Sequence, residues 1–178
     1  MKRCIAKLIL ICIFIIAQIS AHAQFVKAEL VASGLTCSMC SFATQKQLQS
    51  VPFIDTIGTD LNHTTFLLSF KKDSVIDFTL IKKKVEDAGF SVASLVLTFH
   101  FDSLKVDNNY HLYYQNSLYH FINLKSRILN GNTKLKLIDK GFVSDKEYKK
   151  YRKVIDNHTS EQAGNTRIIT HVYHIIVL

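Results

Sequence analysis

The chain has few cysteines and prolines and lacks the short motifs that mark common enzymes. It contains four cysteines, one proline and no tryptophan among 178 residues. Cys4 and Cys12 belong to the N-terminal leader described below, and the two remaining cysteines are too few for a disulfide framework. There is no Gly-x-Ser-x-Gly, no phosphate-binding glycine loop and no His-Glu-x-x-His. We therefore expect a protein that is not an enzyme.

The first 23 residues have the pattern of a secretory signal peptide. Three basic residues lie among the first seven, residues 8–16 are almost continuously apolar, and residues 21–23 read Ala-His-Ala, a small-x-small cleavage site. The competing interpretation, a retained membrane anchor, needs roughly 18 to 20 unbroken apolar residues, and this run is shorter. We predict a signal peptide over residues 1–23, a mature chain that begins at Gln24, a secreted or periplasmic location, and no stable membrane anchor after cleavage.

The mature chain is moderately basic. Without the three basic residues of the leader, the 22 basic side chains become 19 against 14 acidic ones, so the net charge falls from +8 to +5. The lysines are spread along the chain instead of forming a basic patch. This distribution argues against nucleic acid as a partner and favours acidic partners or anionic surfaces.

Hydrophobic periodicity predicts six elements in the first half of the mature chain. Strands are predicted from alternation, and helices from apolar spacings of three and four. The elements are a strand over residues 27–33, a helix over 38–50, a hairpin of 57–61 and 66–70, a helix over 78–88 and a strand from residue 90. Pro52 and Gly89 end the two helices. This order is the split βαβ arrangement of a ferredoxin-like sandwich, which makes the expected fold class α+β.

The first predicted helix has a weak apolar stripe. Thr44 and Gln47 occupy positions where apolar residues would be expected. Ala43, Leu48 and Phe42 are therefore the side chains that we expect to face the core.

A paired-cysteine motif, Gly34-Leu35-Thr36-Cys37-Ser38-Met39-Cys40, joins the first strand to the first helix. With the element order and the Glu86-Asp87-Ala88-Gly89-Phe90 segment, it resembles the heavy-metal-associated domain of copper chaperones, metal-pumping ATPases and periplasmic mercury-binding proteins. The resemblance covers about residues 26–97. It implies that Cys37 and Cys40 are the metal ligands, that Thr36 helps to hold the loop, and that Phe90 closes over the site. Leu35 stands where many members have methionine.

Two thiolates with no third protein ligand nearby suit a soft ion that accepts two-coordinate geometry. Cu(I) fits this description best, with Ag(I) and Hg(II) next, whereas structural Zn(II) normally takes four ligands and is a weaker alternative. A helix N-terminus should favour the thiolate of Cys40. Met39 is a soft side chain, but its place between the cysteines predicts that it points outward. An open site allows handover, so the expected partner is a transporter or another thiol-bearing metal carrier.

Two other functions could use the same residues. An exported Cys-x-x-Cys pair meets an oxidising environment, which makes a dithiol redox protein the main alternative. The motif lacks the preceding tryptophan of thioredoxin-like enzymes, and Pro52 leaves no later proline to face the thiols, so the metal site is favoured. In a third interpretation the module is an interaction scaffold without metal, because a fold does not determine a function.

Residues 99–178 predict a second, mostly-β domain of unknown role, with an OB-like barrel as the expected form. Strands are predicted at residues 110–114, 118–124, 134–138 and 167–177, and a helix starts near residue 144. This half contains six of the eight histidines, and none of their pairs has a compelling spacing for a metal ligand. His111 and His120 could face each other across a hairpin, whereas His171 and His174 should lie on opposite faces of one strand.

Overall fold

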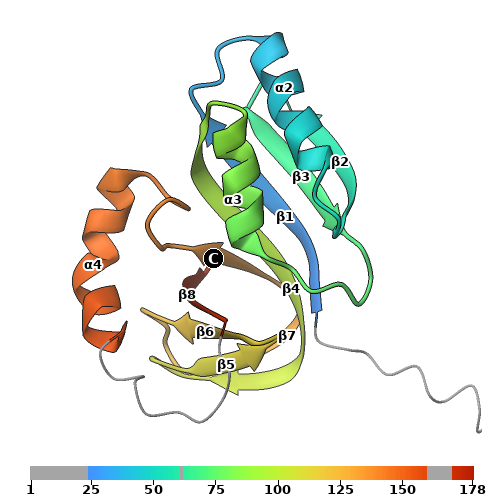
Figure 1. Cartoon of the computed structure of the whole chain (residues 1–178). Helices are drawn as coiled ribbons and strands as arrows, with labels where there is room; N and C mark the ends of the chain where they lie inside the picture. Colours follow the sequence, from blue (N-terminus) through green and yellow to red (C-terminus); the bar gives the residue numbers. More distant parts are fainter. Residues whose placement is uncertain (1–23, 61, 160–169) are drawn as a thin grey trace, which may run out of the picture.

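The computed structural model describes residues 24–60, 62–159 and 170–178, which form an α+β fold (Figure 1). The elements are β1 Gln24–Ser33, α2 Ser38–Gln49, β2 Ile54–Asp60, β3 Thr65–Phe70, α3 Phe78–Asp87, β4 Ser91–Val106, β5 His111–Tyr114, β6 Ser117–Phe121, β7 Arg127–Leu137, α4 Asp145–Thr159 and β8 His171–Val177. All eight described strands belong to one mixed sheet in the order β2-β3-β1-β4-β7-β8-β6-β5. The predicted signal peptide lies outside the described residues. Within these ranges, no helix has the length and apolarity of a membrane span.

The first six elements follow the order that the sequence predicts. β1 lies between β3 and β4 and is antiparallel to both, while β2 and β3 form the predicted hairpin. Because side chains alternate along a strand, Ala28, Leu30 and Ala32 share one face of β1, and all three are buried. Figure 1 shows α2 and α3 on one side of these strands. α3 buries Phe78, Ile81 and Val85, the predicted spacing of three and four.

The packing predicted for α2 is wrong in detail. The buried residues are Ser41, Thr44 and Leu48, whereas Ala43 is exposed and Phe42 is 60% exposed. Thr44 is fully buried because its hydroxyl donates to the carbonyl of Cys40 at 3.0 Å, so the polar atom is satisfied within the helix. A small polar face therefore replaces the apolar stripe that we expected on this helix.

β4 is longer than predicted and connects the two halves of the molecule. It runs from Ser91 to Val106, pairing with β1 as far as His100 and with β7 from Val96 onward. The predicted domain boundary, between residues 98 and 99, falls inside this strand. One buried apolar cluster contains residues from both halves, including Leu30 and Tyr173.

The C-terminal strands extend the same sheet and curl. β7 and β8 are antiparallel, β8 and β6 are parallel, and β6 forms a hairpin with β5. The curl brings the ring of Tyr114 on β5 to 5.5 Å from that of Phe25 on β1 and 5.1 Å from that of Phe99 on β4, between centroids. β2 and β5 remain the edges of the sheet, so hydrogen bonds among the described strands do not close the predicted OB-like barrel.

α4 covers the opposite face of the C-terminal strands. Tyr173 and Ile175 of β8 belong to the main core, while Ile176 packs against a second small cluster of Ile122, Ile138, Val143 and Ile155. On the same face, the Lys136 ammonium of β7 lies 2.7 Å from the Glu147 carboxylate of α4. The sheet is therefore covered by α3 on one face and by α4 on the other.

Candidate functional site

The paired cysteines lie at the start of α2, on the loop that leaves β1. Gly34 has a φ of +87°, a left-handed conformation that L side chains rarely adopt, and it turns the chain from the strand into the loop. Cys37 is the N-cap of α2, and its carbonyl accepts from the amide of Ser41 at 3.2 Å. Cys40 lies one turn further along the helix. The loop and the capped helix thus place both thiols at one end of the molecule.

The thiol of Cys37 is electrostatically favoured as a thiolate. Its Sγ accepts from the backbone amide of Cys40 at 3.3 Å, where a capping oxygen usually lies. The pKa of Cys37 is lowered, chiefly by the hydrogen bond from the Cys40 thiol and then by the Cys40 backbone amide. No acidic residue lies in the first turn of α2 to offset its positive end. Sequence analysis did not predict a lowered pKa for Cys37.

The donor set consists of two thiols. Cys37 is exposed, Cys40 is half-buried, and neither forms a disulfide. Among the described residues, no three His, Cys, Asp or Glu side chains are placed to hold one ion. Met39 is 72% exposed, in agreement with its predicted outward direction. Such a pair fits an ion that is satisfied by two thiolates and fits tetrahedral Zn(II) poorly.

The loop that carries the cysteines is packed against the main core on one side, and exposed apolar side chains lie near it. Leu35 and Phe90 are partly buried and pack against the main core. A Cβ placed on Gly34 would lie 3.5 Å from Cδ1 of Phe90, so this ring lies beside the base of the loop. Phe42 is exposed, as is Met39, and both are on the turns of α2 that carry the cysteines. Exposed apolar side chains therefore lie on the same turns of α2 as the thiols.

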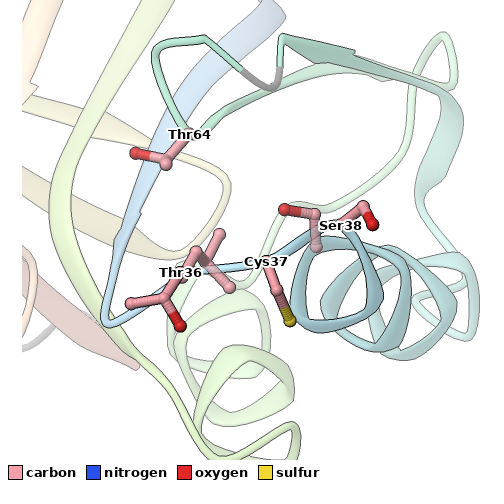
Figure 2. Close-up of a pocket in the computed structure, with 6 residues that line it drawn as sticks. Thr36, Cys37, Ser38 and Thr64 are labelled. Carbon is pink, nitrogen blue, oxygen red and sulfur yellow. The ribbon is translucent and has the colours of Figure 1, made fainter.

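A pocket of about 220 Å³ lies beside Cys37, between the loop and the turn that joins β2 to β3. Its lining residues are Leu35, Thr36, Cys37, Ser38, Ser41 and Thr64. Figure 2 shows Thr64 across from Thr36, with Cys37 and Ser38 at the start of α2. The Thr64 carbonyl accepts from the Ala32 amide at 3.4 Å, which holds the turn next to β1. Sequence analysis did not predict Ser41 or Thr64 as site residues.

A second polar cluster lies on the C-terminal strands. His111, His120 and His174 are in register across β5, β6 and β8. The ring centroids of His111 and His120 are 4.6 Å apart, which confirms that these two side chains face each other. The His174 ring lies 5.4 Å from that of His120, and His120 is fully buried. His171 stacks on Tyr173, two residues along the strand, so it faces away from His174 as predicted.

Asp139 fixes the orientation of His174. Its carboxylate accepts from the backbone amide of His174 at 2.7 Å and lies 2.7 Å from Nδ1 of the same residue. His174 is only 4% exposed, so this pairing lies within the fold. Nothing in the sequence indicated this pairing, because Asp139 and His174 are 35 positions apart, with all of α4 between them.

Comparison with models of known protein families gave no match to this chain, and a search of curated proteins found no significant match.

Proposed function

We propose that this protein is an exported carrier that holds a soft metal ion, Cu(I) above all, between Cys37 and Cys40 and passes it to a partner. The observation that carries the proposal is the exposed Cys37 thiol of lowered pKa, with a second thiol one helical turn away. The element order of β1 to β4 and the resemblance of residues 26–97 to heavy-metal-associated domains support it. In this proposal the first half is a ferredoxin-like metal-binding unit and the protein is not an enzyme.

Each residue of the site has a separate role in the proposed handover. Cys37 and Cys40 bind the ion as thiolates, and their protons pass to solvent on loading. The positive end of α2 partly offsets the negative charge of the metal dithiolate. An incoming thiol of the partner reaches the exposed Cys37 and adds to the ion before an original thiolate leaves. Met39 and Phe42 supply the apolar contact that holds the partner during the exchange.

Substitution of either cysteine tests the proposal. Cys37→Ser and Cys40→Ser should each abolish tight binding of one Cu(I) in anaerobic competition with a chromophoric chelator, because one thiolate and one hydroxyl do not form a soft two-coordinate site. Met39→Leu is the matched control, since it removes the remaining soft side chain of the motif and should leave affinity unchanged. Tight binding by both serine variants would place the site elsewhere. Loss of Cu(I) binding in Met39→Leu would show that Met39 is a third ligand of the ion.

A dithiol redox function is the second candidate, and the same observation favours it. An exposed thiolate of lowered pKa beside a second thiol is the arrangement that attacks disulfides. Intact mass under native, anaerobic conditions separates the candidates. A mass increase of one Cu(I) supports the carrier. Loss of two hydrogens together with disulfide reductase activity supports the redox protein. If neither result is obtained, an interaction scaffold is favoured.

A further inference from the structure

The ring of His174 has a buried nitrogen without a hydrogen-bond partner. Its Nδ1 lies 2.7 Å from the Asp139 carboxylate. An ionised carboxylate only accepts hydrogen bonds, so Nδ1 carries the proton and Nε2 of the neutral ring carries a lone pair. Nε2 is buried and makes no hydrogen bond within the described residues. Buried polar atoms nearly always have a partner, so this lone pair indicates a ligand for the ring.

His174 belongs to a row of three histidines on adjacent strands. His111 of β5 is in register with His120 of β6, which is in register with His174 of β8. Residues paired in register share a face of the sheet, and this face is opposite to the main core that contains Tyr119 and Tyr173. His111 is exposed, whereas His120 and His174 are buried. The row therefore leads from the surface into the face that α4 covers.

The spacing of the three rings fits one metal ion. A ligating histidine nitrogen lies about 2.0–2.1 Å from zinc, which places the ring centroid about 3 Å from the ion. Two such rings at a tetrahedral angle are then roughly 5 Å apart between centroids. The centroids of His120 and His174 are 5.4 Å apart, and those of His111 and His120 are 4.6 Å apart. Both separations are close to the value that a shared ion requires.

Binding of an ion requires the outer ring of the row to turn. Within the described ranges, no three His, Cys, Asp or Glu side chains are already placed to hold one ion. The ring planes of His111 and His120 are 35° apart, so these rings lie almost face to face and do not point at a common atom. The His111 side chain is exposed, and exposed side chains change rotamer within nanoseconds. A new rotamer of His111 can therefore bring its nitrogen towards the two buried rings.

Asp139 holds His174 as a metal ligand is usually held. Ligating histidines almost always donate their other ring N–H to a carboxylate, a carbonyl or water, which fixes the tautomer and the ring orientation. The Asp139 carboxylate accepts from Nδ1 of His174 and also from its backbone amide, each at 2.7 Å. The ring is thus fixed at two points, with the lone pair of Nε2 directed away from the carboxylate.

We propose that His111, His120 and His174 bind one divalent ion that prefers imidazole ligands, Zn(II) above all, with Asp139 as the positioning residue. Imidazole suits Zn(II), Cu(II) and Ni(II), whereas the two thiols of the first half suit a soft monovalent ion. Water completes a tetrahedral site on the side of the exposed His111. No electrons are transferred, and His174 loses no proton because Nε2 binds through its lone pair. The inference does not rest on the proposed function of Cys37 and Cys40.

The test uses the mature chain with Cys37→Ser and Cys40→Ser, so that the thiols cannot bind the probe. This thiol-free protein should bind one Zn(II) in competition with a chromophoric chelator, and one Co(II) with the visible absorption of a tetrahedral site. Asp139→Asn in the same background should weaken Zn(II) binding by about 10–100-fold. It should also shift the Co(II) absorption at saturation, because the His174 ligand becomes less basic, and a purely structural role would not cause that shift.

A pair of exposed histidines provides the matched comparison. His111→Ala should weaken Zn(II) binding at least as much as Asp139→Asn, because it removes a ligand, and the exposed position should leave the fold intact. His63→Ala should have no effect on affinity, although His63 also contacts a carboxylate, that of Asp60, at 2.8 Å. The urea transition of the tyrosine fluorescence verifies that each variant folds.

Three results would overturn the inference. If the folded thiol-free protein binds no Zn(II), the lone pair of His174 is satisfied by water alone. Equal affinities in His111→Ala and His63→Ala would place the ion away from the histidine row. An unchanged Zn(II) affinity in folded Asp139→Asn would remove the positioning role and with it the argument from His174. Failure of Cu(I) to bind the unmodified protein would contradict the proposed function and leave each of these measurements unaffected.

Discussion

Phe25 joins the two halves of the molecule, and its removal should destabilise both. It lies on β1 and is 5% exposed. Its ring centroid is 4.7 Å from that of Phe99, 5.2 Å from Phe78, 5.5 Å from Tyr114 and 5.3 Å from Tyr119. Truncation of a buried phenylalanine to alanine removes such contacts and leaves a cavity, at about 3–5 kcal/mol. With a urea m-value of about 2 kcal/mol per molar, the midpoint of Phe25→Ala should fall by roughly 1.5–2.5 M.

Tyrosine fluorescence measures this effect in the half that does not contain Phe25. All seven tyrosines lie at residue 110 or later, and the chain has no tryptophan. Phe42→Ala is the matched control, because the same truncation at a 60% exposed position should change the stability by less than about 0.5 kcal/mol. An unchanged tyrosine transition in Phe25→Ala would falsify the coupling and support two independent units. The same reasoning predicts that a fragment of residues 24–98, which ends inside β4, gives no cooperative thermal transition.

Three further predictions concern local features. Alkylation of Cys37 by iodoacetamide, followed on its peptide by mass spectrometry, should have a pH midpoint below the ordinary value of 9.0, and Cys40→Ala should raise that midpoint because it removes the main cause of the lowered pKa. Gly34→Ala and Gly89→Ala should each lower the free energy of unfolding by about 1–2 kcal/mol, since both positions have a left-handed φ, and an unchanged urea midpoint would contradict this. Asp139→Ala should lower the free energy of unfolding by about 2 kcal/mol or more, because the substitution leaves donors of the buried His174 without an acceptor. A decrease of less than about 0.5 kcal/mol would show that the pairing contributes little.

The order of the first six elements could be predicted from local signals, which are strong for the strands and for the second helix. Phe78, Ile81 and Val85 recur at helical spacing, and Gly89 is a natural stop. The packing of α2 could not be predicted in the same way. A periodicity argument treats Thr44 as polar, whereas its hydroxyl is satisfied by the preceding turn and its remaining atoms can enter the core.

The length of β4 and the extent of the site depend on contacts that are distant in sequence. Alternation continues through Phe99, but only pairing with β7 determines that the strand passes the end of the first unit. Thr64 reaches the pocket because β3 pairs with β1, and Ser41 reaches it because it lies on the first turn of α2, which Cys37 caps. The cysteine pair could be recognised in the sequence because a spacing of three positions places both thiols on one helical turn. The pocket walls come from segments that the fold brings together.

The pairing of β4 with β7 also protects the protein from association with itself. A sandwich of β1 to β4 alone would expose the backbone donors and acceptors of β4, a long strand that could pair with another chain. In the complete fold those groups are paired from Val96 onward, and the exposed edges are β2 and β5. β5 has four residues, and the pairing of β2 is interrupted by a register shift between Ile54 and Thr56. Short or irregular edges make poor templates for another strand, so the C-terminal half should keep the thiol-bearing half soluble at concentrations where the isolated unit would aggregate.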